Sequence, residues 1–539
     1  MLYFLRRLDM GIYLNPGNDN FYKFVKAGIY VDKTGLIKEL NKLVDNPARN
    51  FVCVSRPRRF GKTLAEDMLA AYYSKGADSA SLFAPYEIAQ SPDFKEYLNK
   101  FNVIYVDMNA MYSEWKSYVP KEKREASAVD YVTSRICSDF RTQFVDVDFG
   151  EGSSLASYIQ QVYEQKKETF IIIIDEYDVF VREEVPKEDF DLYLAFLNSL
   201  FKNTSLKSAI SLAYITGILP IIRDKIQSKL NTFHEYTILT PGLFAEYTGF
   251  TSTDVKKLCA KYNCSFEECK SWYDGYKLKG FEIYNPQAVF NAVTNNDFRS
   301  YWSATSTYRV VAEKISMNFD GTKDDVITML AGGRVDVNVE KYENRMDSFC
   351  SKDDVFTFLI HLGYLAYDED EEVCYIPNRE IHKEWQNAVS DNADYGETNK
   401  IIADSKNLLR ETLAGNEEAV ARALDISHMH VTSNRSYNNE DSLQSAIYLA
   451  YIYALNGYVI EKEATAGKGF ADIVYIPFDK TKAAMIVELK HNKSAATALN
   501  QIKEKEYFHC LANWQGDVLF VGINYDEKTK KHECKIERL

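Results

Sequence analysis

The stretch NFVCVSRPRRFGKTLAEDML, residues 50–69, decides the fold of the first half of the chain. It opens with a short apolar run and closes with apolar residues at helical spacing, which predicts a buried strand followed by a helix. Between them stand Gly61, Lys62 and Thr63, the end of the phosphate-binding pattern G-x-x-x-x-G-K-[ST]. Arg56 replaces the first glycine of that pattern. The stretch therefore indicates either an altered phosphate loop or a chance Gly-Lys-Thr at a helix start.

A phosphate loop binds its anion because backbone N–H groups at a helix N-terminus face the phosphates, while the lysine adds charge and the hydroxyl residue holds Mg²⁺. We expect Lys62 and Thr63 to take these two roles. The arginines of the loop could contact phosphates, reach the nucleotide of a neighbouring subunit, or stay solvated. The predicted nucleotide contacts of the loop are Arg58, Arg59, Phe60, Gly61, Lys62 and Thr63.

A second motif, FIIIIDEYD at residues 170–178, is an apolar strand that ends in acids. This is the form of a Walker B motif, in which Asp175 would organise Mg²⁺ and Glu176 would polarise an attacking water. Solvated acids after a buried strand are the alternative. A further strand ends in Thr216, which could sense the γ-phosphate or simply cap the strand. Because both motifs occur in order and each ends a strand, an ATPase-type site is favoured.

Strands that alternate with helices predict a mainly parallel α/β sheet in the first part of the chain. A helix-rich region and a helical connector follow, and a second α/β unit closes the chain. The expected strands are 51–55, 102–108, 169–174 and 209–215, then 458–464, 470–476, 484–490 and 516–522. The expected helices include 61–74, 126–144 and 188–201, then 441–455 and 495–508.

The last α/β unit carries a group of charged residues whose types and spacing have a chemical explanation. Asp472 lies in one predicted strand, and Glu488 and Lys490 lie two residues apart on the next, so both point to the same face. Hydrolysis of a phosphodiester needs carboxylates to hold Mg²⁺ and a nearby cation to steady the developing charge. The Val-Glu-Leu-Lys segment alone also fits an exposed edge strand, so the spacing by itself leaves both interpretations open.

Several segments together resemble AAA-ATPase-like proteins in which an ATPase-like module precedes a PD-(D/E)XK nuclease-superfamily domain. The segments are YLNPGNDNFYKFVKAGIYVDKTGLI (13–37), SRPRRFGKT (55–63), IIIIDEYD (171–178), YITGILPI (214–221), WYDGYKL (272–278), YNPQAVFNAV (284–293) and YWSATS (301–306). The resemblance implies an α/β multidomain fold. Its expected parts are a P-loop AAA-like core at 10–240, a helical or winged-helix-like middle at 241–395, a helical connector at 396–439 and a restriction-endonuclease-like α/β domain at 440–539.

The same resemblance implies roles in the last domain. Asp472 and Glu488 would hold the metal, Lys490 would be the catalytic lysine and Gln501 a supporting polar residue. Glu463 or Glu440 would complete the acids, and Glu463 is favoured. The glycine-arginine that usually precedes the aspartate is here Gly469-Phe470-Ala471, so one basic residue for nucleic-acid contact is missing.

These motifs predict a protein that binds and hydrolyses ATP with Mg²⁺ and cleaves DNA or RNA under the control of ATP. The alternative is a nucleotide-controlled binding switch whose nuclease-like fold cleaves nothing. The net charge of −14 argues against a protein that binds nucleic acid over its whole surface. Residues 441–539, with 13 basic and 13 acidic residues, are neutral and could still hold a local basic groove. No apolar stretch is long enough for a membrane span, and nine scattered cysteines suit a reducing cytoplasm. An oligomer is possible, and the sequence does not specify it.

Overall fold

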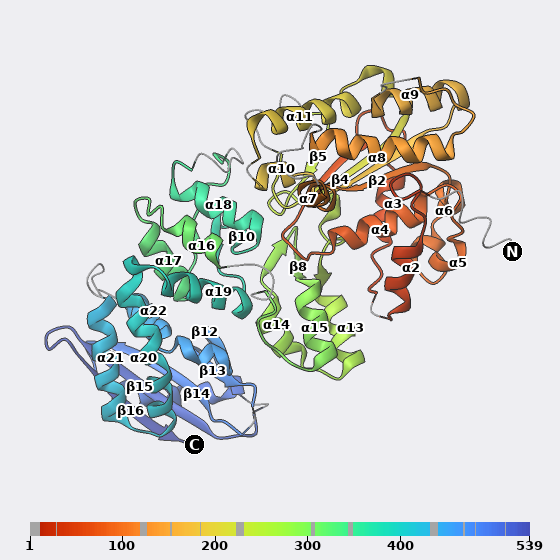
Figure 1. Cartoon of the computed structure of the whole chain (residues 1–539). Helices are drawn as coiled ribbons and strands as arrows, with labels where there is room; N and C mark the ends of the chain where they lie inside the picture. The colour runs from red at the N-terminus through yellow and green to blue at the C-terminus, as the bar shows by residue number, and fades with distance from the viewer. Residues whose placement is uncertain are drawn as a thin grey trace. The chain divides into compact units, whose positions relative to one another are not determined.

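The computed structural model describes residues 11–28, 30–118, 127–150, 154–183, 185–221, 231–302, 308–342, 349–431, 440–466, 469–479, 481–511 and 514–539 (Figure 1). The chain divides into two compact units. The first unit comprises Met1–Tyr262, Gly275–Asn295 and Asn338–Glu369, and the second comprises Asn263–Asp274, Asn296–Val337 and Asp370–Leu539. The four-part division expected from the sequence stays a prediction.

The first unit is built on a five-stranded sheet with the order β2-β3-β4-β1-β5. All of its neighbouring strands are parallel, as the alternation of strands and helices predicts. The strands are β1 (Phe51–Ser55), β2 (Asn102–Asp107), β3 (Phe170–Asp175), β4 (Ile210–Gly217) and β5 (His234–Tyr236). Strand β4 therefore lies between the strand that leads into the phosphate loop and the strand that ends in Asp175.

Strand β3 shows why this sheet is central to the unit. Every residue of β3 is buried, and its isoleucines divide between two apolar clusters on opposite faces. Ile172 and Ile174 belong to one cluster and Ile171 and Ile173 to the other. A strand buried on both faces needs a continuous apolar sequence rather than an alternating one. Helices therefore cover both faces of the sheet.

One face is covered by helices that precede or follow β1, and the other by helices inserted between β2 and β4 (Figure 1). On the first face lie α2 (Asp19–Lys26), α3 (Gly35–Asn41) and α4 (Lys62–Tyr73), with the short α5 (Ala80–Phe83), η2 (Glu87–Gln90) and α6 (Phe94–Tyr97). On the second lie α7 (Met108–Tyr118), α8 (Ala128–Gln143), α9 (Leu155–Lys166), α10 (Val179–Arg182) and α11 (Lys187–Phe201). The helices expected at 61–74, 126–144 and 188–201 are confirmed.

The helix-rich middle of the chain also forms small sheets. In the first unit, β6 (Phe250–Thr251), β8 (Phe281–Tyr284) and β7 (Tyr276–Leu278) pair antiparallel in that order. The remaining elements of this unit are η4 (Thr204–Leu206), η5 (Gly242–Phe244), α13 (Ser252–Tyr262), α15 (Pro286–Asn295), α18 (Lys352–Leu362) and β10 (Ala366–Asp368).

The second unit contains the C-terminal sheet, with the order β12-β13-β14-β15-β16. Only the pair β14 and β15 is parallel. The strands are β12 (Tyr458–Ala466), β13 (Gly469–Pro477), β14 (Ala484–His491), β15 (Val518–Asp526) and β16 (Lys531–Arg538). The sequence did not predict β16. The predicted helix 495–508 ends early, as α23 (Ala495–Glu504), because Glu506 takes a left-handed φ of 55° before η8 (Tyr507–Leu511).

The helices expected to form a connector pack against this sheet. Asp425 of α21 (Glu417–Val431) accepts a 2.7 Å hydrogen bond from the backbone N–H of His532, and Glu417 accepts one of 3.0 Å from Ile536. The other elements of the unit are α14 (Phe266–Tyr273), α16 (Arg309–Ile315), α17 (Thr322–Leu330), β9 (Val335–Asp336), β11 (Val373–Tyr375), α19 (Arg379–Ser390), η6 (Ala393–Tyr395), α20 (Gly396–Leu413), α22 (Glu440–Ala450) and η7 (Ile452–Asn456).

Candidate functional site

The phosphate loop connects β1 to α4 through a left-handed residue. Gly61 has φ 82° and is the N-cap of α4, which begins at Lys62. This conformation favours glycine because an L side chain is strained there. The loop therefore delivers the N-terminus of a helix of 12 residues, with its unpaired N–H groups, to the carboxyl edge of the sheet.

The side chain of Lys62 lies against the loop itself. Its Nζ donates hydrogen bonds of 3.2 and 3.3 Å to the carbonyls of Arg56 and Pro57, and it lies 3.7 Å from Glu176 Oε1. Lys62 is buried, so its charge is shielded from water. The ammonium of Lys62 therefore lies between the carbonyls of the loop and the carboxylate of Glu176.

Asp175 ends β3 and is held from two sides. Thr63 Oγ1 donates a 2.6 Å hydrogen bond to its Oδ2, and Thr216 Oγ1 donates one of 2.8 Å to its Oδ1. Thr216 is fully buried on β4 and is not among the residues that line the cavity described below. Its observed position orients Asp175 rather than presenting a hydroxyl to a nucleotide.

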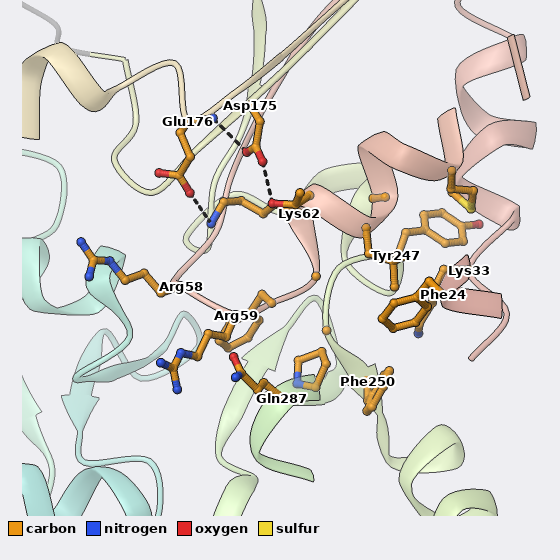
Figure 2. A pocket seen from close by; sticks show the side chains of 18 of the residues that line it. Phe24, Lys33, Arg58, Arg59, Lys62, Asp175, Glu176, Tyr247, Phe250 and Gln287 are labelled. Atoms are coloured by element: carbon orange, nitrogen blue, oxygen red, sulfur yellow. Dashed lines mark hydrogen bonds and ion pairs between the residues drawn. The ribbon is translucent and has the colours of Figure 1, made fainter. Parts of the chain in front are cut away.

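Glu176 follows directly and is the most strained residue of the motif, with φ 54°. A left-handed glutamate is uncommon, and such backbone strain concentrates at functional sites. Burial raises the pKa of its carboxyl, while the neighbouring cations Lys62 and Arg182 act in the opposite direction. The carboxylate faces Lys62 (Figure 2).

Arg56, at the position of the missing glycine, anchors the loop. Its guanidinium is fully buried and donates 2.9 Å hydrogen bonds to Thr248 Oγ1 and the carbonyl of Tyr236, and one of 2.8 Å to the carbonyl of Ser55. Burial lowers the pKa of Arg56 to about 10. The three roles considered for this arginine from the sequence are therefore wrong, because a buried side chain with these partners reaches neither phosphate nor solvent.

Arg58 and Arg59 behave differently from Arg56, since both line a cavity beside the loop. Arg59 has φ 70°, and Figure 2 shows the guanidinium groups of both extending away from Asp175. Phe60 also belongs to the cavity wall, but its ring is buried in an edge-to-face contact with Tyr276, 5.3 Å between centroids. Phe60 is thus a second anchor of the loop.

The cavity has a volume of about 620 Å³, within the range of small-molecule sites. Lys62, Asp175 and Glu176 lie at one side of it, and Phe24, Lys33, Tyr247 and Phe250 at the other (Figure 2). Further residues that line the cavity are Tyr30, Val31, Leu64, Met68, Pro286, Gln287 and Phe290. One cavity therefore combines a charged end with an aromatic end.

In the second unit, the C-terminal candidate residues also meet. Lys490 Nζ lies 2.8 Å from Glu488 Oε1, and the amide of Gln501 donates to the same oxygen. Glu488 is almost fully buried, which, with the charge of Asp472, raises its pKa to about 7 against the effect of Lys490. Asp472 Oδ2 accepts a 2.6 Å hydrogen bond from the backbone N–H of Leu489. Glu488, Lys490, Gln501 and Asp472 thus form one cluster.

The third acid is not settled by this geometry. Glu463 is exposed on β12, with φ 48°, in the strand that pairs with the strand of Asp472. The side chain of Glu440 lies outside the part of the chain that the structure describes. Among the described residues, no group of three or more His, Cys, Asp or Glu side chains is arranged to hold a metal ion.

Family comparisons match the two regions of the chain in which these residues lie. Residues 16–227 match the model of a family described as Predicted AAA-ATPase, and residues 438–535 match that of the PD-(D/E)XK nuclease superfamily. The chain joins an AAA-ATPase-like region to a PD-(D/E)XK region. The two family matches confirm the resemblance and the fold class that the sequence predicted.

One curated relative, described as an uncharacterized protein in the vnfD 5' region of Azotobacter chroococcum mcd 1, is 25% identical over 285 residues. The match covers 52% of this chain and 51% of that protein, so the chain spans about half the length of this relative.

Similar solved structures are the ORC2 protein of Aeropyrum pernix in ADPNP-ADP complexes (12% identity, 66% of this chain, 92% of that chain, TM-score 0.28) and Cdc6p of Pyrobaculum aerophilum (8%, 67%, 93%, 0.22). A third is Drosophila ORC bound to DNA (10%, 66%, 85%, 0.23). The fold assignment rests on the two family matches and on the parallel sheet of the AAA-ATPase-like region.

Sequence reasoning missed several residues of these sites. Asp107 ends β2 beside Asp175 and lines the cavity of the AAA-ATPase-like region, and the rule that parallel strands present their carboxyl ends at one edge could have found it. Arg182 lines the same cavity and pairs with Glu176. In the PD-(D/E)XK region, Tyr507 accepts a 3.1 Å hydrogen bond from Gln501. The aromatic end of the cavity gave no sequence signal, because its residues come from distant segments.

Proposed function

We propose that the AAA-ATPase-like region binds and hydrolyses ATP with Mg²⁺, and that the PD-(D/E)XK region cleaves nucleic acid when ATP permits it. The observation that carries the first half is the convergence of Lys62, Thr63, Asp175 and Glu176 at one end of a single cavity. These groups come from two segments 112 residues apart in the sequence. Together they supply a cation, a hydroxyl and two carboxylates beside the N-terminus of α4.

The donor set at this end suits Mg²⁺. The oxygens of Thr63 and Asp175 are hard ligands that lie 2.6 Å apart, so these two side chains would hold the cation. Bound Mg²⁺ would neutralise phosphate charge during transfer. Lys62 would hold the phosphates, and Glu176 would accept the proton of the attacking water.

The aromatic end of the cavity suits the base and sugar of the nucleotide. Phe24, Tyr247 and Phe250 offer flat apolar surface, and the Gln287 amide can both donate and accept a hydrogen bond. An apolar wall with a few polar groups is the usual composition of a small-molecule site. Adenine in this end would place its phosphates toward Lys62.

The second half of the proposal rests on the buried cluster of the PD-(D/E)XK region. Glu488 Oε2 is buried and has no hydrogen-bond partner among the described residues, which suits a cation ligand. Asp472 and Glu488 would hold Mg²⁺, and Lys490 would steady the charge on the phosphate. DNA or RNA is the substrate class that this chemistry requires.

The experiment that tests the proposal measures ATP binding, ATP hydrolysis and cleavage of linear, circular and single-stranded DNA and RNA with Mg²⁺. Lys62→Ala should abolish ATP binding, and Glu488→Gln should abolish cleavage while ATP hydrolysis continues. Lys42→Ala and Glu504→Gln change exposed residues of the same kinds and serve as controls. Cleavage that persists in Glu488→Gln contradicts the nuclease site, and wild-type protein that binds no ATP contradicts the nucleotide site.

A second candidate function is a nucleotide-controlled binding switch without cleavage. Phe470 favours it, because its side chain is 63% exposed two residues before Asp472, where a cation would serve phosphate contacts. In this case ATP controls the binding of a protein or nucleic-acid partner. Wild-type protein that binds ATP and cuts no polymer with Mg²⁺ or Mn²⁺ supports the switch.

We also propose a reducing compartment such as the cytoplasm, since the nine cysteines are scattered along the sequence and include no C-x-x-C pair. None of the helices that the structure describes is long and apolar enough to cross a bilayer.

A further inference from the structure

The carboxylate of Glu176 lies between two cations. Its Oε1 lies 3.7 Å from Lys62 Nζ, and its Oε2 contacts the guanidinium of Arg182. The side chain of Glu176 is 21% exposed, and the residues on both sides of this contact line the cavity. The negative charge of Glu176 is therefore directed at the place where nucleotide phosphates would bind.

Arg182 is fixed in position by its own partners. It ends the short helix α10, and its Nε lies 3.1 Å from Asp178 Oδ2. The same Asp178 oxygen accepts hydrogen bonds of 3.1 and 2.8 Å from the backbone N–H groups of Ile218 and Leu219, just beyond β4. The guanidinium is thus tied to the sheet and cannot follow a ligand freely.

The charges around Arg182 are otherwise negative. Asp178, Glu176 and Glu183 all stabilise its protonated form, while burial acts against it. The charge on Asp178 is already met by two N–H donors. The net effect is that Arg182 supplies compensating charge to Glu176.

We propose that Arg182 is a positioning residue that holds Glu176 and cancels its repulsion of the nucleotide phosphates. This inference rests on the proposed ATP site and adds a residue to it. Without Arg182, the carboxylate of Glu176 would keep Lys62 as its sole nearby cation among the described residues and would compete with the phosphates for it. In low-exposure surroundings such a competing charge acts strongly, because water screens it little.

The experiment is a double-mutant cycle on the affinity for Mg²⁺-ATP, measured by calorimetry on the full chain with Arg182→Gln, Glu176→Gln and the double variant. We expect Arg182→Gln to weaken binding about tenfold and Glu176→Gln to change it less than about threefold. The double variant should bind like Glu176→Gln alone, because no carboxylate remains to be compensated. Arg182→Lys keeps the charge but not the two separate nitrogens that reach Glu176 and Asp178, so its affinity should lie between those of Arg182→Gln and wild type.

Arg135→Gln is the matched control, since Arg135 also pairs with a glutamate, Glu114 at 3.1 Å, on an exposed surface. Equal losses of affinity from Arg182→Gln in the wild-type and Glu176→Gln backgrounds would overturn the inference, because they would indicate direct contact with phosphate. No loss in either background would overturn it as well. Wild-type protein that binds no nucleotide would instead contradict the proposed function and, with it, the inference.

Discussion

Thr63 Oγ1 donates a 2.6 Å hydrogen bond to Asp175 Oδ2, so the first turn of α4 is tied to the end of β3 across the parallel sheet. Because both oxygens are ligands that Mg²⁺ prefers, this contact marks where the cation would sit. The hydrogen bond joins the phosphate loop and the acidic end of β3 into one site.

Removing the hydroxyl of Thr63 should uncouple ATP binding from Mg²⁺. We expect Mg²⁺ to raise the ATP affinity of the wild type by about tenfold or more and that of Thr63→Ala by less than about twofold, as measured by calorimetry with and without a chelator. Thr63→Ser retains the oxygen and should behave like wild type. A full Mg²⁺ effect in Thr63→Ala would show that the cation lies elsewhere.

Replacing Arg56 by the glycine of the phosphate-binding pattern should destabilise the folded protein. Arg56→Gly removes the hydrogen bonds to Thr248, Ser55 and Tyr236 and leaves a cavity in their place. The free energy of unfolding should fall by about 3 to 5 kcal/mol in denaturant titrations. Arg58→Gly, at an exposed position of the same loop, should cost less than about 1 kcal/mol. Equal stability of the two variants would contradict the anchoring role of Arg56.

Glu384 should make stability depend on pH. It is fully buried on α19, neither carboxylate oxygen has a hydrogen-bond partner among the described residues, and burial raises its pKa to about 7. The pKa of Glu384 is higher in the folded than in the unfolded protein. Its contribution to the free energy of unfolding is therefore fully present below about pH 4.5 and is lost as the pH rises through 7. Glu384→Gln removes this titration.

We therefore expect the free energy of unfolding of Glu384→Gln, relative to wild type, to rise by about 3 kcal/mol between pH 4.5 and pH 8. Denaturant titrations at several pH values measure the difference. A difference that does not change with pH would show that Glu384 is ionised or solvated in the folded protein.

Metal binding by the PD-(D/E)XK region should strengthen with pH up to neutrality. Glu488 has its pKa raised to about 7 chiefly by burial, and a carboxyl must lose its proton to bind a cation. The apparent affinity for Mn²⁺ should rise roughly tenfold for each pH unit below 7 and level off above it. Glu488→Gln should remove this dependence, whereas the same dependence in that variant would assign it to another group.

Much of the fold follows from local sequence. The run 170–174 is apolar throughout, which predicts a buried strand, and Gly61, Lys62 and Thr63 after the strand 51–55 predict a helix start. Strand β16 was not predicted because many of its residues are charged, which hides the apolar pattern of a strand. The outermost strand of a sheet tolerates such charged side chains. The early end of α23 depends on the left-handed Glu506, which has no local signature.

The sites were less predictable than the motifs. Arg56 was misread because its partners Tyr236 and Thr248 are contributed by segments about 180 residues further along the chain. The sequence left open whether Thr216 senses a phosphate or caps its strand, and in the structure it is buried on β4 and donates a hydrogen bond to Asp175. Such roles depend on tertiary contacts, which a one-dimensional pattern does not contain.

The most direct test of the account is the rate of nucleic-acid cleavage by wild-type protein with Mg²⁺ alone, with ATP, and with a non-hydrolysable ATP analogue, beside Lys62→Ala under the same conditions. We expect ATP to change the wild-type rate by about tenfold or more and to leave the rate of Lys62→Ala unchanged. A cleavage rate that is the same in all three wild-type conditions and in Lys62→Ala would contradict control of the nuclease by ATP.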